Sequence, residues 1–405
     1  MLPPPARREL QGQPSSRASR AAPPGAGGLR SAGMSRETAF HPRIAALTDD
    51  WMDLFGYAAP AVVTGTSEEY RAVREAVGLM DFSMLRKVDV TGPGALALLD
   101  GMLTRDLTRL RPGHIAYGAL VDDDGKMVDD CTASVLAEDH VRFCGANDRD
   151  AEMFAAAAAG TEVAVRPFTD DMPHLCVQGP RSRDLLAALT DDDLSNAAFP
   201  YYTFRDGVRI AGIPVFMTRL GYTAELGYEL WVERDRALEL WDVLMEEGQA
   251  WGMRLVGMTA LDLLRIEGGF IIGGVEYDPS VSPFECGLGW AVDFAKERLH
   301  GRAGLERDRT ATTRRLASVV LDDGGDEATA APLHLRNGGA PIGVVTQAVH
   351  SPLLEGRTLG LAQVHRDHRS AGTAVVAVVG GREVAGEIVS HPVYDPQRTR
   401  AKEKS

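Results

Sequence analysis

The chain has 405 residues, about two to four times the length of one typical domain, so two or three packed units are expected. Hydrophobic residues make up 44% and charged residues 25%, which is ordinary globular usage and excludes a mostly disordered, collagen-like or coiled-coil chain. The formal net charge of -14 argues against non-specific binding to nucleic acid or to anionic lipid.

The four cysteines are scattered along the chain without a Cys-x-x-Cys pair, so neither a disulfide framework nor a structural zinc site is indicated. This usage fits a reducing compartment, and we expect a cytoplasmic protein. No run of about 18 apolar residues occurs, so no transmembrane segment is predicted. We therefore expect no bound metal, no membrane and no nucleic acid among its partners.

The two ends of the chain differ in composition from the rest. Residues 1–33 are rich in Pro, Gly, Ser and Arg and hold almost no large apolar side chain, which predicts a disordered leader. Because Met34 opens the first globular-looking sequence, a start assigned too far upstream is one interpretation, and an Arg-rich transit peptide is the other. Residues 398–405 are predicted to form a charged tail.

A β-hairpin is the clearest local prediction. The extended candidates 115–121 and 127–135 are separated by Asp122-Asp123-Asp124-Gly125, and an Asp-Gly step is a strong two-strand turn signal. The other expected elements are strands at 87–90, 141–144 and 230–232, a second hairpin over 208–218, and helices at 95–103, 148–158, 234–247 and 259–267.

The C-terminal part of the chain changes character. From Leu316 to Val393 there is repeated Val/Ile/Ala alternation with glycines at turns and few helix signals, which indicates a separate all-β unit, a barrel, over 312–397. Strands and helices interleave in the preceding region, 34–311. The fold class is therefore α+β.

Two weak motifs have ordinary explanations. Gly92-Pro93-Gly94-Ala95-Leu96-Ala97 fits the dinucleotide pattern G-x-G-x-x-A, but Pro93 removes a backbone N–H that a pyrophosphate would need, which favours a plain strand-to-helix turn. His365 and His368 are three residues apart in an Arg-rich stretch, but no third ligand is in view for a metal.

The adjacent carboxylates Asp129 and Asp130 lie in the second strand of the predicted hairpin. Neighbouring strand residues point to opposite faces, so one of the two must look inward. A buried carboxylate is costly unless it is paired, and such residues are often functional. The alternative is a solvated hairpin beside an Asp-rich turn.

The stretch from Leu220 to Leu230 interleaves glycines, tyrosines and glutamates and makes a poor core strand. One interpretation is an ordinary turn before the strand at 230–232. The other is the wall of a polar, aromatic-lined pocket for a flat heterocycle, in which a carboxylate accepts from ring N–H groups.

Four blocks in the same order resemble the folate-dependent aminomethyltransferase superfamily, typified by the T-protein of the glycine cleavage system. Tyr117-Gly118-Ala119-Leu120 through Asp129-Asp130 resembles its catalytic hairpin. Gly221-Tyr222-Thr223-Ala224-Glu225-Leu226-Gly227-Tyr228-Glu229 resembles its G-Y-T-G-E-x-G-x-E segment. Leu263 to Gly269 with Ser282 to Trp290 resembles L-R-L-E-A-G and T-P-x-E-A-G-L-x-W, and Ile342 to Thr346 with Ser351-Pro352 resembles a barrel motif.

The resemblance implies three domains around a central hole that receives tetrahydrofolate, with two intertwined α+β domains in 34–311 and the barrel last. By position, Asp130 matches the catalytic aspartate and Glu229 the carboxylate that accepts from the pterin ring. The remaining cofactor-binding residues implied by the resemblance are Tyr117, Asn147, Tyr202, Tyr222, Arg265 and Trp290.

The implied activity is transfer of an aminomethyl or methyl group from a small donor to tetrahydrofolate, with a lipoyl carrier protein as a possible partner. This chain departs from the T-protein pattern at Phe55 to Pro60, at Ala224, at Leu261 where many relatives carry Arg, and at Val275 to Pro279, which is similar to the demethylase branch. A tetrahydrofolate-dependent O- or S-demethylase is therefore one alternative, and a non-catalytic folate-binding protein is a second.

Overall fold

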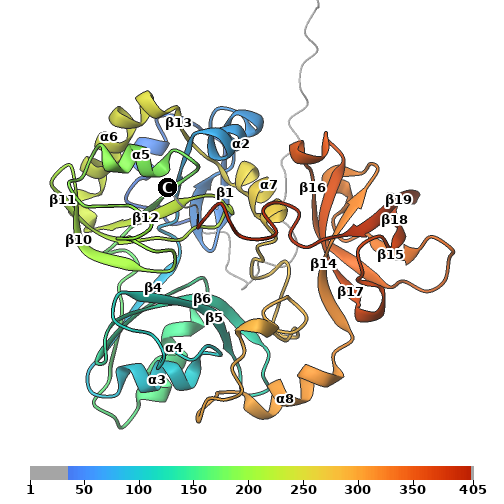
Figure 1. Cartoon of the computed structure of the whole chain (residues 1–405), viewed down its shortest axis with the longest axis horizontal. Helices are drawn as coiled ribbons and strands as arrows, with labels where there is room; N and C mark the ends of the chain where they lie inside the picture. The colour runs from blue at the N-terminus through green and yellow to red at the C-terminus, as the bar shows by residue number, and fades with distance from the viewer. Residues whose placement is uncertain (1–34, 403–405) are drawn as a thin grey trace, which may run out of the picture.

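The computed structural model describes residues 35–402 and contains two β-sheet units and a β-barrel (Figure 1). The leader predicted for 1–33 and residues 403–405 of the predicted tail lie outside the described residues. The α+β class with a C-terminal barrel is confirmed. No helix within 35–402 is long and apolar enough to cross a membrane.

The first unit is built on a six-stranded sheet with the order β10-β11-β12-β9-β3-β13. Its strands are β3 (Val77–Asp81), β9 (His174–Gln178), β10 (Phe204–Ile210), β11 (Ile213–Thr218), β12 (Gly227–Val232) and β13 (Met253–Leu255). Its helices are α1 (His41–Ile44), α2 (Thr66–Glu75), α5 (Ser182–Ala187), α6 (Ala237–Gly248) and α7 (Met258–Gly268), and the small hairpin β1 (Trp51–Leu54) and β2 (Tyr57–Pro60) precedes α2.

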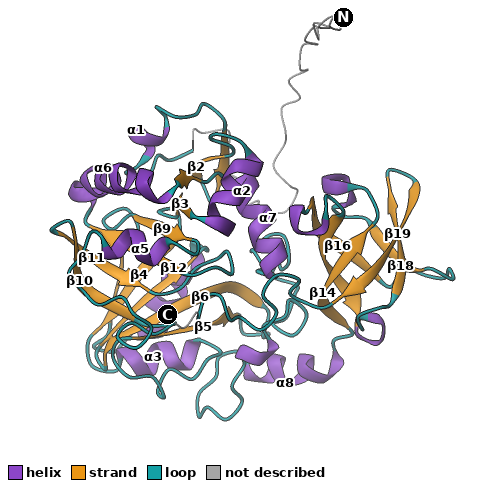
Figure 2. Ribbon diagram, turned by 45° about the horizontal axis from the view of Figure 1, so that its top comes forward, coloured by secondary structure: helices purple, strands orange, loops and turns teal. Residues whose placement is uncertain are grey.

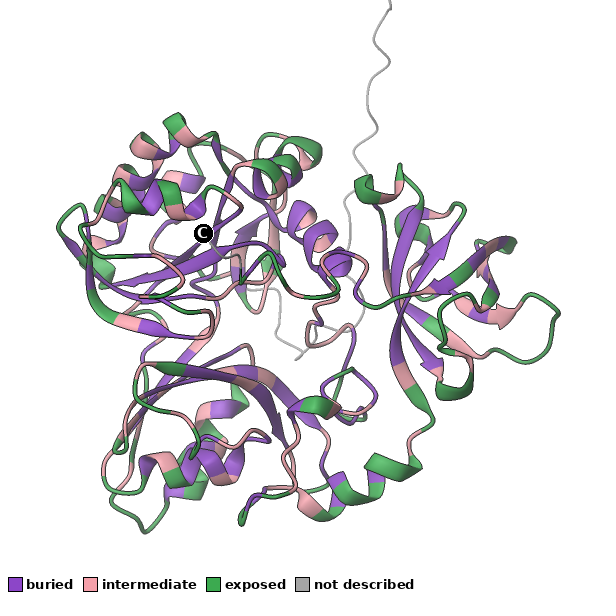
Figure 3. Cartoon of the chain, viewed as in Figure 1, coloured by how far each residue is buried: buried purple, intermediate pink, exposed green. Residues whose placement is uncertain are grey.

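Alternation along β12 sorts its side chains onto two faces. Tyr228 and Leu230 belong to the core shared with α6, whereas Trp231 joins a second cluster on the opposite face. Glu229 lies on the same face as Trp231, because residues two apart in a strand share a face. Buried leucines of α5 and α6 pack in the same core as Tyr228 and Leu230, and the outer sides of these helices are exposed (Figure 3).

The second unit is a five-stranded sheet with the order β5-β6-β7-β4-β8. Its strands are β4 (Arg86–Thr91), β5 (His114–Val121), β6 (Met127–Ala137), β7 (His140–Gly145) and β8 (Ala164–Pro167), and helices α3 (Ala95–Met102) and α4 (Arg149–Ala158) pack on it. The predicted hairpin is confirmed as β5 and β6. Gly92 and Gly94 have φ values of 102° and 91° and form the turn from β4 into α3, as expected.

The chain passes from the first sheet into the second and back again. Strand β3 is paired with β9, and the whole five-stranded sheet lies between them in sequence. A β-strand followed by such a long excursion cannot be recognised as half of a pair from local sequence.

The barrel closes in the order β14-β17-β16-β15-β18-β19 (Figure 2). Its strands are β14 (Arg314–Leu321), β15 (Pro332–Leu335), β16 (Gly343–His350), β17 (Thr358–His365), β18 (Ala374–Val379) and β19 (Arg382–Val389), and α8 (Arg302–Ala311) precedes them. Val, Ala and Leu side chains fill its interior. Closure leaves no free strand edge.

Helix α7 joins the barrel to the rest of the molecule. It contacts α2 on one side and β16 and β17 on the other. Ser351 donates to Glu267 Oε1 at 2.7 Å across this junction. Beyond β19 the chain returns to the first unit, where Arg219 Nη2 donates to Ala401 O at 3.1 Å. The described part of the tail therefore packs onto the first unit.

Candidate active site

The hairpin of β5 and β6 presents Asp130 at the centre of a hydrogen-bonded group. Tyr117 donates its hydroxyl to Asp130 Oδ2 at 2.8 Å, from the neighbouring strand. Tyr277, from the loop after α7, places its hydroxyl oxygen 2.6 Å from Asp130 Oδ1. The carboxylate thus has a phenol on each oxygen.

Tyr277 was not among the site residues expected from the sequence. Its hydroxyl also accepts the backbone N–H of Asp130 at 3.0 Å and lies 3.1 Å from Asp129 Oδ1. The only sequence signal was the unusual stretch from Val275 to Pro279, which gave no indication of a contact with the hairpin.

Asp130 is half-buried and its pKa is raised. Burial raises the pKa of Asp130 to about 6, and the charge of Asp129 adds to this rise. The hydroxyls of Tyr277 and Tyr117 act in the opposite direction, because they stabilise the carboxylate. A group with this pKa can exchange a proton near neutral pH.

Asp129 points to the other face of β6, toward α4, and is 2% exposed. Its Oδ2 accepts the backbone N–H groups of Ala146 and Asn147. The Asn147 side chain donates to Val128 O at 2.8 Å. The expectation that one of the two carboxylates looks inward is confirmed for Asp129, and Asn147 lies beside it rather than against the Asp130 carboxylate.

Aromatic rings surround the Asp130 side of the hairpin. The rings of Tyr117 and Trp290 lie 6.3 Å apart, and Trp290 is 62% exposed. Tyr222 packs 5.1 Å from Phe270. Burial raises the pKa of Tyr117 well above its ordinary value, and the charge of Asp130 and the hydrogen bond to it raise it further. The structure thus brings together Asp130, Tyr117 and Trp290 of the predicted site residues, whereas the ring of Tyr202 packs 4.6 Å from that of Tyr201.

Arg265 is fully engaged within the protein. Its guanidinium is 1% exposed and donates to Glu276 at 3.0 Å, to Asp262 at 2.8 Å and to Gln347. Because Gln347 belongs to the barrel, this group ties α7 to the barrel. A contact between Arg265 and a cofactor stays a prediction.

Glu229 lies in a different buried cluster between the two sheets. Its carboxylate accepts from Thr218 at 3.0 Å and from the indole of Trp231 at 3.4 Å. Lys87 is nearby, and burial lowers the pKa of Lys87 to about 8. A pterin contact for Glu229 therefore also stays a prediction.

The same cluster contains potential metal ligands. One ligand atom each from His174, Cys176 and Glu229 lies within 4.8 Å of the other two. The Lys87 ammonium already supplies a positive charge beside Glu229. The carboxylate is therefore balanced without an ion, and we assign no metal to these residues.

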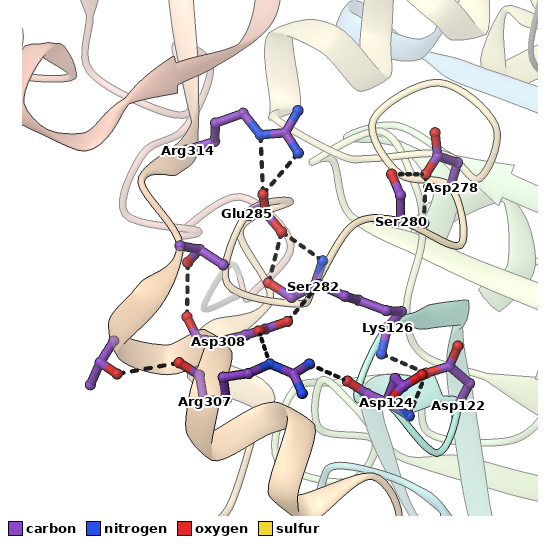
Figure 4. Close-up of polar contacts among 12 residues, drawn as sticks. Asp122, Asp124, Lys126, Asp278, Ser280, Ser282, Glu285, Arg307, Asp308 and Arg314 are labelled. Atoms are coloured by element: carbon purple, nitrogen blue, oxygen red, sulfur yellow. Dashed lines mark hydrogen bonds and ion pairs between the residues drawn. The ribbon is translucent and has the colours of Figure 1, made fainter.

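The tip of the hairpin of β5 and β6 is anchored on α8, as Figure 4 shows. Lys126 Nζ donates to Asp308 at 2.6 Å, and Arg307 donates to Asp124 O at 3.0 Å. A β-carbon at Gly304 would lie 1.8 Å from Asp124 O, so the turn rests directly on the helix backbone. This contact fixes the position of the strand that carries Asp130.

Two family models match the chain. The GCVT N-terminal domain matches residues 22–296 and the glycine cleavage T-protein C-terminal barrel domain matches residues 314–395. Among curated relatives, the trimethylamine-oxide aldolase of Ruegeria pomeroyi is 35% identical over 91% of this chain. The chain spans about half of that relative's length, 48%.

Other relatives match along nearly their whole length. The aminomethyltransferase of Halothermothrix orenii is 33% identical over 84% of this chain and 95% of its own length. That of Streptomyces coelicolor is 35% identical over 90% of this chain and 98% of its own. The aminomethyltransferase T structure from Bartonella henselae shares the fold, with a TM-score of 0.79 and 24% identity over 89% of this chain and 98% of that one. The chain belongs to the glycine cleavage T-protein family of aminomethyltransferases.

Proposed function

We propose that the protein is an enzyme that transfers a one-carbon unit from a small donor to tetrahydrofolate. The observation that carries the proposal is the Asp130 carboxylate, held between the hydroxyls of Tyr117 and Tyr277 with a pKa raised to about 6. A non-catalytic binding protein has no need of a carboxylate poised to exchange a proton near neutral pH.

The residues around Asp130 fit a folate. Tyr117, Tyr222 and the exposed Trp290 offer ring faces for a flat heterocycle. The acidic end of a folate needs a cation, and Arg265 has its donors engaged. Arg398 is a better candidate, because its Nη1 is shielded from solvent without a hydrogen-bond partner among residues 35–402.

Arg398 lies close to the predicted cofactor residues. Its guanidinium carbon is 4.6 Å from the centre of the Phe270 ring, which packs against Tyr222. Its charge also lowers the pKa of Tyr202, although burial raises that pKa overall. A carboxylate of the folate tail would supply an acceptor for Arg398 Nη1.

Tetrahydrofolate, when bound, supplies the ring nitrogen that receives the one-carbon unit. The work left to this chain is to bind, to orient and to handle a proton. In our proposal Asp130 Oδ1 and Oδ2 accept from the two tyrosines, and the carboxylate assists proton transfer as the carbon changes partner. Tyr117 and Tyr277 hold it in one orientation.

The donor is proposed to carry its transferable carbon on nitrogen. The names of two groups of relatives, aminomethyltransferase and trimethylamine-oxide aldolase, both describe a carbon bonded to nitrogen. O- and S-methyl compounds are the alternative donors suggested by the stretch from Val275 to Pro279. A lipoyl carrier protein as donor, and a cytoplasmic location, are further parts of this proposal.

The test is a binding titration followed by product analysis. Quenching of tryptophan fluorescence by tetrahydrofolate, and not by an equal concentration of free glutamate, is expected because Trp290 lies beside Tyr117. A Kd of 1 mM corresponds to a binding free energy of only about 4 kcal/mol, so absence of binding at about 1 mM tetrahydrofolate would exclude every folate-based function.

Candidate N-methyl, O-methyl and S-methyl donors and an aminomethylated lipoyl carrier are then offered with tetrahydrofolate. Formation of 5-methyl-tetrahydrofolate indicates a methyl donor, and 5,10-methylene-tetrahydrofolate with ammonia indicates aminomethyl transfer. Binding without turnover by any donor would favour the non-catalytic alternative.

A further inference from the structure

Behind the Asp130 carboxylate lies a second buried carboxyl group that the proposed function does not use. Asp150, in the first turn of α4, is 0% exposed, and within residues 35–402 neither of its oxygens meets the geometry of a hydrogen bond when Asp129 and Asp150 are both ionised. Two ionised carboxylates have no proton to donate to each other. An unsatisfied buried carboxylate costs far more than an exposed one, so this group requires an explanation.

Gly145 shows how close Asp150 lies to Asp129. A β-carbon at Gly145 would be 2.2 Å from Asp129 Oδ2 and 2.8 Å from Asp150 Oδ2. The two oxygens therefore lie over the same α-carbon, in space that exists because residue 145 lacks a side chain. The two carboxyl groups are within hydrogen-bonding reach of each other.

The groups around this pair do not neutralise a second negative charge. From β6 and β7 the neighbours are Cys131 and Cys144, and the loop before α4 contributes the backbone of Asn147. Arg86 is a cation whose charge acts on Asp150, and its Nε already pairs with Asp148 at 2.5 Å. Asp130 adds a further negative charge on the far side of Asp129.

We propose that Asp150 is protonated at neutral pH and donates that proton to Asp129, so that the two buried carboxyl groups together carry one negative charge. Burial and the charge of Asp129 both raise the pKa of Asp150 well above its ordinary value, which agrees with the geometry. The inference rests on the buried contacts and does not depend on the proposed function.

This arrangement gives Asp150 a positioning role toward Asp130. Asp150 and the N–H groups of Ala146 and Asn147 donate on the Oδ2 side of Asp129, so they stabilise its negative charge and weaken its attraction for the Tyr277 hydroxyl on the Oδ1 side. The single hydroxyl proton of Tyr277 is then available to Asp130 Oδ1, the closer acceptor at 2.6 Å against 3.1 Å for Asp129 Oδ1. Asp150 thus acts on Asp130 through two intermediate groups.

Infrared spectroscopy of protein labelled with 13C at the aspartate side-chain carboxyl tests the proton directly. At pH 7.5 the difference spectrum between wild type and Asp150→Asn should contain one protonated-carboxyl band and no lost carboxylate band. Asp191→Asn, at an exposed position, serves as the matched control and should lose a carboxylate band. If Asp150→Asn also loses a carboxylate band, Asp150 is ionised and the inference is wrong.

Carbon NMR titration of Asp130 without any substrate tests the positioning role. Asp150→Ala removes the donor to Asp129, so the hydroxyl of Tyr277 is drawn to Asp129 and the midpoint of the Asp130 titration should rise. Asp150→Asn supplies an N–H donor at the same place and should restore the wild-type midpoint. Equal midpoints in the wild type and Asp150→Ala would overturn the positioning role. If Asp150→Ala does not fold, a midpoint in Asp150→Asn that differs from the wild-type value would overturn it instead.

Discussion

The hydroxyl oxygen of Tyr277 lies 2.6 Å from Oδ1 of Asp130, although the two residues are 147 positions apart in the chain. The same oxygen accepts the backbone N–H of Asp130 at 3.0 Å. One phenol therefore fixes both the strand and the carboxylate that it carries. The loop that supplies Tyr277 follows α7, so the site depends on the contact between this loop and the hairpin of β5 and β6.

Asp130→Asn should abolish most turnover while tetrahydrofolate binding is largely kept. The amide retains the shape of the carboxylate but cannot take up a proton, and such proton transfer is typically worth about 100- to 10,000-fold in rate. Steady-state kinetics and fluorescence titration of the same preparation measure both quantities. Asp191→Asn, on an exposed loop, should leave both unchanged. Near-normal turnover in Asp130→Asn would exclude Asp130 from the mechanism.

The pH dependence of kcat/KM should show an acidic limb near pH 6. Because burial and the charge of Asp129 raise the pKa of Asp130 from its ordinary value to about 6, the carboxylate is present above that pH and is lost below it. Activity that requires the carboxylate therefore falls as the pH drops through 6. A rate that stays constant down to pH 5, with the protein still folded by circular dichroism, would contradict this assignment.

Tyr277→Phe should move that acidic limb to higher pH. The hydroxyl of Tyr277 stabilises the Asp130 carboxylate, so its removal raises the pKa of Asp130 further. A hydrogen bond to a charged group is worth about 1.5–3 kcal/mol, which corresponds to a shift of about one to two pH units. Tyr228→Phe removes a buried hydroxyl bonded to Leu194 O, away from Asp130, and is the control. Equal limbs in wild type and Tyr277→Phe would show that the contact has no electrostatic effect.

Glu229→Gln separates a structural role from a cofactor-binding role. The carboxylate accepts hydrogen bonds from the Thr218 hydroxyl and the Trp231 indole inside the protein. In the Gln variant the amide NH2, itself a donor, would face one of these two donors. We expect a loss of about 1–3 kcal/mol in the free energy of unfolding. If Glu229 also meets the pterin, tetrahydrofolate affinity measured on the folded variant falls by a similar amount. Unchanged affinity would make Glu229 a purely structural residue.

Gly304→Ala should disturb the hairpin of β5 and β6 from outside the site. The added β-carbon would lie 1.8 Å from Asp124 O, so either α8 or the hairpin tip must move. Overpacking of this kind costs about 1–3 kcal/mol, and the displaced strand should lower kcat. Gly101→Ala, whose β-carbon meets Arg298 at an ordinary 3.7 Å, is the control for thermal stability. A fully active and stable Gly304→Ala would show that the tip contact does not position Asp130.

Much of the fold was predictable where the sequence carries a local signal. The Asp-Gly turn predicted the hairpin of β5 and β6, and Val/Ile/Ala alternation predicted the barrel. Strands β3 and β9 escaped prediction because every residue in both is buried, so they show no alternation of polar and apolar residues. Their pairing partners are also far away in the sequence.

The candidate site was predictable only along the hairpin. Tyr117 and Asp130 lie on paired strands, so their contact follows from the turn. The positions of Tyr277 and Asp150, which come from other parts of the chain, do not follow from the turn. Tyr277 lies in a loop and Asp150 in a helix, and tertiary packing brings both to the Asp129-Asp130 pair. Their positions in the sequence do not reveal this proximity.

The pairing of β3 with β9 has a consequence for how the protein is made. The 92 residues between them, 82–173, form the five-stranded sheet with α3 and α4. The five-stranded sheet is therefore one continuous segment inserted into the sequence of the six-stranded sheet. During synthesis the insertion can complete its own strand pairing while the six-stranded sheet still lacks five of its strands. In pulse-labelling hydrogen exchange during refolding, we therefore expect the amides of β4 to β8 to become protected before those of β3. The later protection of β3 would mark the time at which the two sheets dock.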